Sequence, residues 1–473
     1  MSTTPTRVAR PELSSSSGAY MILIAATASI GGLLFGYDTG IIASALTPLS
    51  AQFGLDKTME QIVVSSILVG CAVGALGCGA PTDRFGRRRV VAVVAVLFAV
   101  AALLSATTHA TWSLILFRFL LGLAVGGASQ AIPVYVSELA PRAKRGGLVT
   151  TFQLAVIVGI LVSSISGILL VHRQDSWRWM IAFGAVPALV LAVGMLFLPE
   201  SPRYLLRRGR EDEARAVLSR VRPPTANLDS EIAEIREVEE ADARNKGSRS
   251  ELFSPRVRPA LVAGLGVAIF CQITGVNAII YYAPTILAGA GFTGTRGLWA
   301  GLLNSVALLV MTIVGMVLVE RWGRRALLLR FIPLSVVALL VLAFSFSGET
   351  SSAPWLTVVG MVAFMAFNGG SLSVAVWLVM SEIFPLRVRG RAASLAAAAV
   401  WLADLLVSLT TLTLVQNLGA RSTFLVFAVI SLAAYAFTYA AVPETKGRSL
   451  EEIEKSLDDG TFAPRAHHQN SAA

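Results

Sequence analysis

The chain has 473 residues, of which 55% are hydrophobic and only 14% are charged. Soluble domains carry roughly 25% charged residues, so this composition argues against a soluble enzyme, a disordered protein and a fibrous protein. A net charge of +10 would indicate nucleic-acid binding in a soluble protein. Here, however, the basic residues lie in short loops between apolar runs, which is the charge pattern of a membrane protein. We therefore expect no nucleic-acid partner.

The apolar runs have the length of transmembrane helices, since a bilayer span needs ~20 apolar residues. A polar, serine-rich tail covers residues 1–19, and the apolar run after it is too long for the core of a cleavable signal peptide. Twelve spans are predicted, which makes the fold class an all-α membrane protein. They are expected at 20–46, 61–81, 89–107, 112–137, 147–171, 179–198, 260–289, 298–319, 326–346, 355–380, 392–415 and 422–442.

Basic residues cluster in alternate loops. The loop after the second span has four arginines, and the loops after the fourth, eighth and tenth spans have three basic residues each. Loops rich in Lys and Arg face the cytoplasm. We therefore expect a multi-pass protein of the cell membrane with both termini in the cytoplasm.

The long polar stretch 200–259 mixes acidic and basic residues densely, which favours a solvated linker with short cytoplasmic helices. It separates an N-terminal six-helix bundle, 20–199, from a C-terminal six-helix bundle, 260–442. A cytoplasmic tail, 443–473, follows the second bundle. The sequence thus predicts two membrane bundles joined by one linker.

The two halves repeat three motifs in the same order. DRFGRR at 83–88 corresponds to ERWGRR at 320–325, SEL at 137–139 to SEI at 381–383, and PES at 199–201 to PET at 443–445. The offsets are nearly constant, which indicates a duplicated bundle. In such repeats the solute path lies at the interface of the halves near mid-membrane.

Together with GYDTG at 36–40, PESPR at 199–203 and PETKG at 443–447, these motifs resemble the sugar porter branch of the major facilitator superfamily. The resemblance extends from Gly31 to about Glu452. It implies the major facilitator fold, with two pseudo-symmetric six-helix halves. It also implies secondary active transport, namely proton-coupled symport of a sugar or sugar-like polyol by alternating access.

Two charged residues lie in the interior of predicted spans of the N-terminal half. Asp38 is in the first span and Arg118 in the fourth, where an ionisable side chain is costly unless it is paired or neutral. A fixed buried ion pair is one interpretation. The resemblance favours another, in which Asp38 and Arg118 couple proton movement to transport, because proton-coupled sugar porters have an Asp at this place.

Polar and aromatic side chains in several spans match sugar-contacting positions of the family. Amide side chains suit polyhydroxy solutes because each one both donates and accepts hydrogen bonds. The alternatives are helix–helix contacts for the amides and interfacial anchoring for the tryptophans. The predicted substrate-binding residues are Gln153, Gln272, Asn277, Trp377, Trp401 and Asp404.

The second half departs from the family pattern. Cys271 replaces the first of a pair of glutamines, and Leu308 replaces an asparagine for which Asn304, one helical turn away, could substitute. Asp404 occupies an amide position of the family. Three roles stay open for Asp404: a second protonation site, a ligand contact, or a protonated acid buried in packing. The solute is therefore not fixed as a hexose.

The repeated basic motifs carry acidic partners, which a rule for topology alone does not require. In the family such residues form ion-pair networks that hold the cytoplasmic side shut when the protein opens outward. We expect the same of Asp83, Arg84, Arg87, Glu138, Arg145, Glu200, Glu320, Arg321, Arg324, Glu382, Arg389 and Glu444.

Other functions are less consistent with the sequence than symport. A facilitative uniporter is disfavoured by Asp38, and an antiporter or exporter of a non-sugar small molecule is kept open by the altered second half. A sugar-sensing receptor is disfavoured because the tail after Val442 is short. An enzyme is least favoured, since no histidine lies in a span and no catalytic, metal or cofactor constellation is present. We expect the protein to act as a monomer on a small solute and protons.

Overall fold

The computed structural model describes residues 15–141, 145–244, 249–292, 294–347, 350–351, 353–385, 388–448 and 450–462. Within these residues the chain is almost entirely helical, and eleven helices or helix pairs are long and apolar enough to cross a membrane. The N-terminal half contains α1 (Ser15–Phe53), α2 (Lys57–Gly77), α3 (Gly79–Phe85), α4 (Arg87–Thr107), α5 (Thr111–Leu139), α6 (Arg145–Leu170), α7 (Ser176–Phe183) and α8 (Ala185–Phe197).

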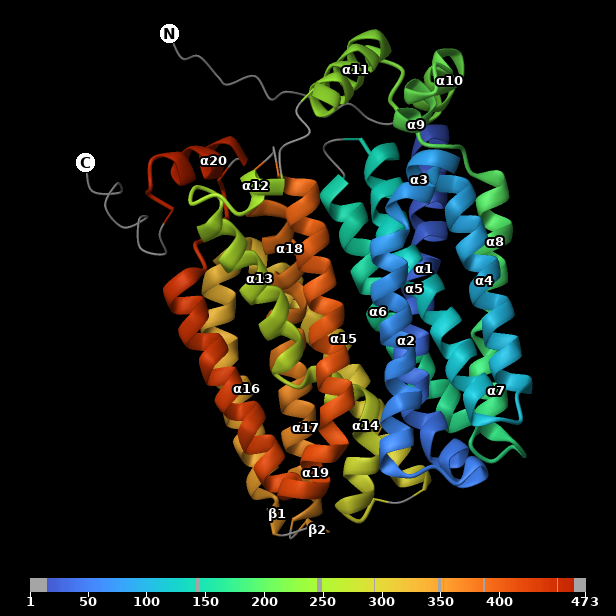
Figure 1. Ribbon diagram of the computed structural model, residues 1–473, viewed down its shortest axis with the longest axis vertical. Helices are drawn as coiled ribbons and strands as arrows, with labels where there is room; N and C mark the ends of the chain where they lie inside the picture. Colours follow the sequence, from blue (N-terminus) through green and yellow to red (C-terminus); the bar gives the residue numbers. More distant parts are fainter. Residues whose placement is uncertain are drawn as a thin grey trace.

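The C-terminal half stands beside the N-terminal half, with its long helices running in the same general direction (Figure 1). A two-stranded antiparallel sheet joins two of its helices, with Phe346 opposite Ser351. The half contains α13 (Arg258–Ile273), α14 (Val276–Gly289), α15 (Thr295–Trp322), α16 (Arg324–Phe344), β1 (Phe346–Ser347), β2 (Thr350–Ser351), α17 (Pro354–Gly369), α18 (Leu372–Glu382) and α19 (Arg389–Ala441).

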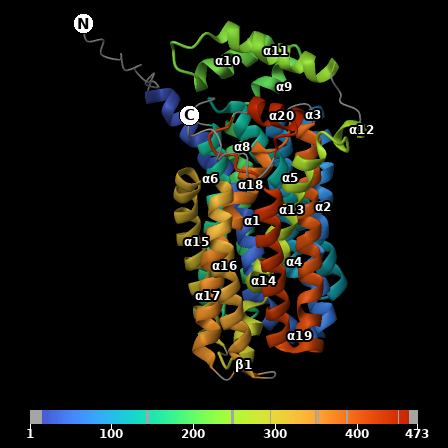
Figure 2. The same cartoon turned by 90° about the vertical axis from the view of Figure 1, so that its left-hand side faces the viewer.

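Short helices cover one end of the molecule, which we call the linker end; the opposite end, with β1 and β2, is the hairpin end (Figure 1). Helices α10 and α11 lie across the linker end (Figure 2). The buried Arg222 fixes them there, because it donates to the Leu139 carbonyl at 2.7 Å and pairs with Glu231 at 2.6 Å. The short helices are α9 (Pro202–Arg207), α10 (Glu211–Val221), α11 (Leu228–Arg244), α12 (Arg249–Leu252) and α20 (Leu450–Asp458).

Helix α19 has 53 residues and contains two spans, because Gly419 adopts a non-helical conformation with φ 80°. Contacts at both ends of α19 show that the chain reverses its direction at Gly419. Arg389, at its start, donates to the carbonyl of Ser381 in α18, and Glu444, just beyond its end, accepts from the first backbone N–H of α16. Both ends therefore lie at the linker end. The predicted fold class is confirmed, with the last two predicted spans joined in one kinked helix.

Two spans of the C-terminal half are broken near their middle. The seventh span divides into α13 and α14 at Gly275, which has φ 95°. The tenth divides into α17 and α18 around Gly370 and Ser371. A break frees backbone groups and redirects side chains inside a membrane protein, which is tolerated where protein or a cavity surrounds it. The break at Gly275 separates Gln272, near the end of α13, from Asn277, at the start of α14.

Glycines allow α1 and α6 to pack in direct contact. A Cβ atom on Gly36 would lie 1.7 Å from the carbonyl oxygen of Val156, and one on Gly159 would lie 2.2 Å from that of Leu33. Small residues at helix crossings let backbones approach closely in membranes. The contact holds Asp38, which follows Gly36 by two residues on α1, at a fixed depth in the bundle.

Candidate functional site

A narrow cavity lies between the two halves, and both predicted coupling residues line it. Asp38 comes from α1, Arg118 from α5, and Trp401 from α19 on the opposite half. The Phe35 and Trp401 rings meet across the interface with centroids 5.3 Å apart. The structure thus brings three of the predicted site residues together in one place.

Asp38 and Arg118 are both buried, with 5% and 1% of their surfaces exposed. The Arg118 Nε donates to the backbone carbonyl of Val63 at 2.9 Å, and its Nη1 has no hydrogen-bond partner. Arg118 acts on the Asp38 carboxyl group through its charge, and no ion pair joins these two described side chains. Asp38 and Arg118 therefore line one cavity without a direct ion pair between them.

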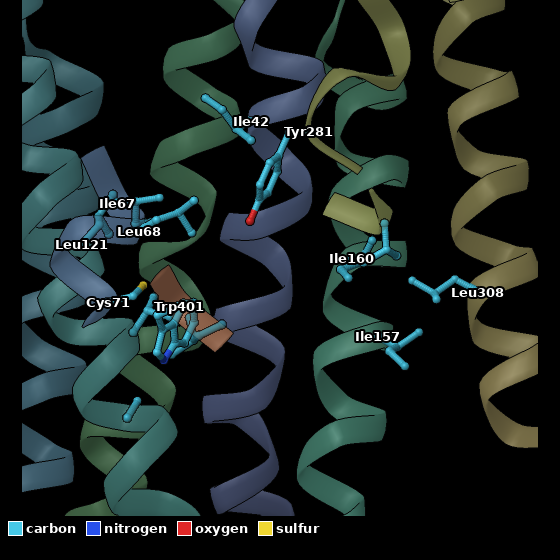
Figure 3. Packing of buried hydrophobic residues seen from close by; sticks show 14 of the residues in the cluster. Ile42, Ile67, Leu68, Cys71, Leu121, Ile157, Ile160, Tyr281, Leu308 and Trp401 are labelled. Carbon is cyan, nitrogen blue, oxygen red and sulfur yellow. The ribbon is translucent and has the colours of Figure 1, made fainter. Parts of the chain in front are cut away.

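Asp404 lies one turn beyond Trp401 on α19 and is also buried. Its Oδ2 accepts a hydrogen bond of 3.0 Å from the hydroxyl of Tyr281, which lines the cavity. Figure 3 shows the hydroxyl end of Tyr281 pointing toward the level of Cys71 and Trp401, which line the same cavity. Sequence reasoning could not predict this contact, because Tyr281 and Asp404 are 123 positions apart.

The other predicted binding residues, three amides and one tryptophan, differ in their contacts and burial. The Asn277 side chain donates to the Gln272 Oε1 at 2.9 Å, so these two residues form a pair across the break at Gly275. Gln153 on α6 is half-buried. Trp377 on α18 is 39% exposed and lines neither of the two cavities described here. The structure joins Gln272 to Asn277 by a side-chain hydrogen bond.

A second cavity at the interface is lined by polar residues, of which only Asn304 was a candidate from the sequence. Ser44, Ser164, Asn304 and Ser305 line it. Both side-chain polar atoms of Asn304 are buried without a hydrogen-bond partner, a costly arrangement unless another group satisfies them. The signal for Asn304 was its position one helical turn from a family asparagine, whereas single serines in apolar spans carry no comparable signal.

Two side-chain hydrogen bonds between described residues cross the interface of the halves. Ser164 on α6 bonds to Ser305 on α15 at 2.7 Å, and Thr413 on α19 donates to Gln61 on α2 at 3.1 Å. Gln61 lies in the first turns of α2 and Thr413 shortly before the turn at Gly419, both at the hairpin end (Figure 1). These contacts join the halves on the side away from the linker.

The N-terminal half has a charged network at the linker end. Arg87 pairs with Glu138 at 3.1 Å and with Asp83 at 3.1 Å. Glu138 also accepts from the hydroxyl of Ser201. Glu200 accepts from the backbone N–H of Arg88 at 3.1 Å. A carboxylate at this position caps the helix and opposes its dipole, so the PES motif fixes the start of α4.

The C-terminal half repeats this arrangement. Arg324 pairs with Glu382 at 2.7 Å, and the Thr445 hydroxyl donates to Glu382 at 2.5 Å. Glu444 accepts from the backbone N–H groups of Arg324 at 2.8 Å and Arg325 at 3.1 Å. The PET motif thus caps α16 as the PES motif caps α4. The sequence repeat corresponds to a repeat in three dimensions.

The remaining members of the predicted network contribute in other ways. The Arg84 guanidinium lies over the Phe85 ring at 5.3 Å. Glu320 pairs with Arg324 at 3.2 Å, and the Arg321 carbonyl accepts from Lys446 at 2.7 Å. The side chain of Arg145 lies outside the described residues. Every linker-end ion pair described here closes within one half, so none of them ties the two halves together in this conformation.

Comparisons with known proteins agree with this arrangement. The sequence model of the family described as "Sugar (and other) transporter" matches residues 24–457. A D-xylose transporter of Levilactobacillus brevis is 38% identical over 434 residues, covering 91% of this chain and 94% of the relative. The arabinose-proton symporter of Bacillus subtilis is 35% identical over 466 residues, covering 96% and 99%.

A solved structure of a sugar symporter has a similar fold. The proton:xylose symporter XylE from E. coli, bound to 6-bromo-6-deoxy-D-glucose, superimposes with a TM-score of 0.78 and 29% identity. The match covers 93% of this chain and 100% of XylE. The chain therefore belongs to the sugar transporter family, and it is a multi-pass membrane transporter of the major facilitator fold.

Proposed function

We propose that this protein moves a small polyhydroxylated solute, a sugar or polyol, into the cell together with protons. It works in the cell membrane as a monomer, with the linker end and both termini in the cytoplasm, and it carries its solute without transforming it. The observation that carries the proposal is the buried Asp38 beside Arg118, which share a cavity without a direct ion pair. Relatives named as proton symporters support it.

The coupling follows from the chemistry of this pair. Apolar surroundings favour a neutral carboxyl group, whereas a nearby guanidinium favours a carboxylate. A small movement of Arg118 relative to Asp38 changes the balance between the two. Proton binding at Asp38 from outside and release to the inside would then accompany the rocking of the halves. The energy of the proton gradient enters the cycle at this residue.

The solute path runs between the halves. Gln272 and Asn277 offer paired amides, Trp401 and Phe35 offer aromatic faces for sugar C–H groups, and Asn304 offers unpaired polar atoms. A site of a few placed polar groups among apolar and aromatic walls is typical of small-molecule binding. Gln153, Trp377 and Asp404 are proposed to join the site as the halves move.

The conformation is consistent with alternating access. Hydrogen bonds join the halves at the hairpin end, whereas the linker-end ion pairs stay within each half. With the linker end in the cytoplasm, this arrangement faces inward. In the outward-facing state we expect the two linker-end networks to meet and close the cytoplasmic side.

External alkalinisation tests the proposal. De-energised cells that express the protein are placed in weak buffer, and sugars, polyols and glycosides are added one at a time. A rise in external pH with one solute identifies the substrate and establishes proton symport. Equilibration of labelled sugar without a pH change would instead mean uniport, and a fall in pH would mean antiport, the two alternatives on the same fold.

A further inference from the structure

One arginine of the C-terminal half lies within a membrane-spanning helix and on its outer surface. Arg330 is in α16, which begins at Arg324, and its side chain is exposed. We propose that Arg330 and Trp322 bind the phosphate group of an anionic phospholipid in the bilayer leaflet at the linker end. The proposal concerns the lipid-facing surface of the transporter, and it is independent of the solute and of proton coupling.

The exposed face of α16 around Arg330 is apolar. Leu334 and Val337 are 42% and 57% exposed, and their spacing of four and seven residues from Arg330 puts all three side chains on one face of the helix. Figure 2 shows α16 at one side of the bundle, beside α15 and α17. An exposed apolar face of a membrane-spanning helix contacts lipid, so Arg330 projects from a lipid-facing surface.

The side chain of Arg330 reaches from this depth toward the head groups. Since a helix rises about 1.5 Å per residue, Arg330 lies about 9 Å along α16 from Arg324. Helical side chains tilt toward the N-terminus of their helix, which for α16 is the linker end. The guanidinium carbon of Arg330 lies 4.4 Å from the centroid of the Trp322 ring, at the end of α15. This arrangement keeps the charge out of the hydrocarbon.

The contact with Trp322 leaves the N–H groups of the guanidinium free. The aromatic ring lies against the guanidinium carbon, whereas the N–H groups point outward in the guanidinium plane. Among the residues that the structure describes, none forms a hydrogen bond or an ion pair with the Arg330 side chain. The fork of N–H donors matches the two charged oxygens of a phosphate diester.

Further positive charge lies beside Trp322. The Lys446 Nζ donates to the carbonyl of Arg321, the residue before Trp322, at 2.7 Å. The nearby carboxylates of this half are already engaged by Arg324 or by the backbone at the start of α16; they are Glu320, Glu382 and Glu444. Basic residues near the membrane surface attract anionic lipids. Because Arg330 is on the lipid-facing surface, the anion that it meets is a phospholipid.

The N-terminal half provides an internal comparison. The repeat of DRFGRR and ERWGRR aligns Phe85 with Trp322 and Val93 with Arg330. Val93 is 67% exposed on α4, as expected for an apolar residue that faces lipid. ERWGRR already has three arginines for orientation in the membrane, so topology does not require a fourth one inside the span. The phosphate-binding pair is therefore a feature of the C-terminal half alone.

Quenching of Trp322 by brominated lipids tests the proposal. Purified protein is reconstituted in phosphatidylcholine vesicles with a fraction of brominated phosphatidylglycerol or of brominated phosphatidylcholine. For each variant, the Trp322 signal is the difference from the same protein with Trp322→Phe. A basic residue at an anionic membrane surface contributes about fivefold in binding. We expect the wild type to prefer phosphatidylglycerol, and Arg330→Val to lower this preference about fivefold.

Arg220→Val is the matched control. Arg220 is exposed on α10, across the linker end, so its loss changes the net charge equally without altering the lipid-facing surface. This variant should keep the wild-type preference. Equal quenching by both lipids in the wild type, or an unchanged preference in Arg330→Val, would overturn the site. An equal fall in Arg330→Val and Arg220→Val would also overturn it, because only net charge would then matter.

A gain of binding keeps the proposal testable if Arg330→Val folds poorly. Val93→Arg combined with Phe85→Trp builds the same pair in the N-terminal half. The tryptophan introduced at position 85 should then be quenched more strongly by brominated phosphatidylglycerol than by brominated phosphatidylcholine. Phe85→Trp alone is the control and should show a preference about fivefold smaller. Equal preferences in the double and the single variant would contradict the role of the arginine in selecting an anionic lipid.

Discussion

The amides of Gln272 and Asn277 satisfy each other across the break at Gly275, with the Asn277 side chain donating at 2.9 Å. This pairing holds one donor and one acceptor in a fixed direction before the solute arrives. A solute hydroxyl that replaces or extends this hydrogen bond gains from the preorganisation. The arrangement makes the pair sensitive to loss of either member.

We expect Asn277→Ala to raise the KM for the solute about tenfold. The variant removes one proposed solute contact and leaves the Gln272 oxygen without its donor, a loss of about 1–2 kcal/mol for a hydrogen bond in a buried site. Uptake rates over a range of solute concentrations measure this change. Gln416→Ala, at an exposed amide near the hairpin end, is the control and should leave the KM unchanged.

Sequence reasoning could identify some of the site residues and not others. Asp38, Arg118 and Asp404 were recognisable because a charged side chain within an apolar span is unusual. Ser164 and Ser305 were not, since their meaning comes from a contact between residues 141 positions apart. Single polar residues become a site only when the fold brings them together.

At the scale of the elements, the two caps at the linker end fix where spans begin. Glu444 accepts from three successive backbone N–H groups, those of Arg324, Arg325 and Ala326. A Cβ on Gly323 would lie 2.3 Å from the Glu444 carboxylate, and Gly323 has φ 94°. Only glycine fits both the conformation and the approach of the carboxylate. The PET motif and the glycine of ERWGRR therefore act together.

Glu444→Ala should destabilise the protein by about 1–2 kcal/mol, because the N-terminus of α16 loses its cap and the charge that opposes its dipole. A lower midpoint of thermal unfolding in detergent measures the effect. The control is Glu320→Ala, whose side chain is 67% exposed beside Arg324, since exposed ion pairs contribute little. Equal midpoints for both variants would contradict the capping role.

The close packing of α1 against α6 can also be tested by mutation. Gly36→Ala should lower the midpoint of unfolding and the yield of folded protein, because its Cβ would lie 1.7 Å from the Val156 carbonyl and close-packed helices cannot absorb the change without moving apart. Gly77→Ala is the control, since a Cβ there meets nothing within 4 Å. A Gly36→Ala protein as stable as Gly77→Ala would disprove the close packing.

Hydropathy predicted the spans closely but not their interruptions. The predicted span 260–289 corresponds to α13 and α14, yet the break at Gly275 was not expected, because averaging over an apolar window hides one residue with φ 95°. In α19, conversely, the two predicted spans 392–415 and 422–442 are separated only by Gly419, whose φ of 80° is not helical. In both places the backbone conformation of one glycine determines where the helix is interrupted.

At the scale of the whole molecule, the halves are joined at the hairpin end in this conformation. Ser164 and Ser305 lie in hydrogen-bond contact across the interface. Alternating access requires this contact to break when the transporter opens outward. The pair therefore reports directly on the rocking of one half against the other.

The double variant Ser164→Cys with Ser305→Cys should form a disulfide under mild oxidation and lose transport, which a reductant should restore. Each single variant is a control that keeps its activity under oxidation, since Cys71, Cys78 and Cys271 are buried. Crosslinking is read from the gel mobility of a protein cleaved in the linker. Full transport by the crosslinked protein would contradict the movement of the halves at this contact.

The duplicated motifs also belong to this scale. The repeat at 83–88 and 320–325 suggested equivalent networks, and each half has an Arg–Glu pair joined to a Ser or Thr. The sequence could not indicate which state the structure would adopt, because all the members are present in every state. Whether the networks meet depends on the relative position of the halves.

The central claim is that Asp38 couples protons to the solute. The most direct test compares Asp38→Asn with the wild type in energised proteoliposomes, measuring accumulation and exchange of labelled solute in the same preparation. We predict that Asp38→Asn loses accumulation driven by the proton gradient, while solute exchange across the membrane persists at a substantial fraction of the wild-type rate. Full accumulation by Asp38→Asn would contradict the account.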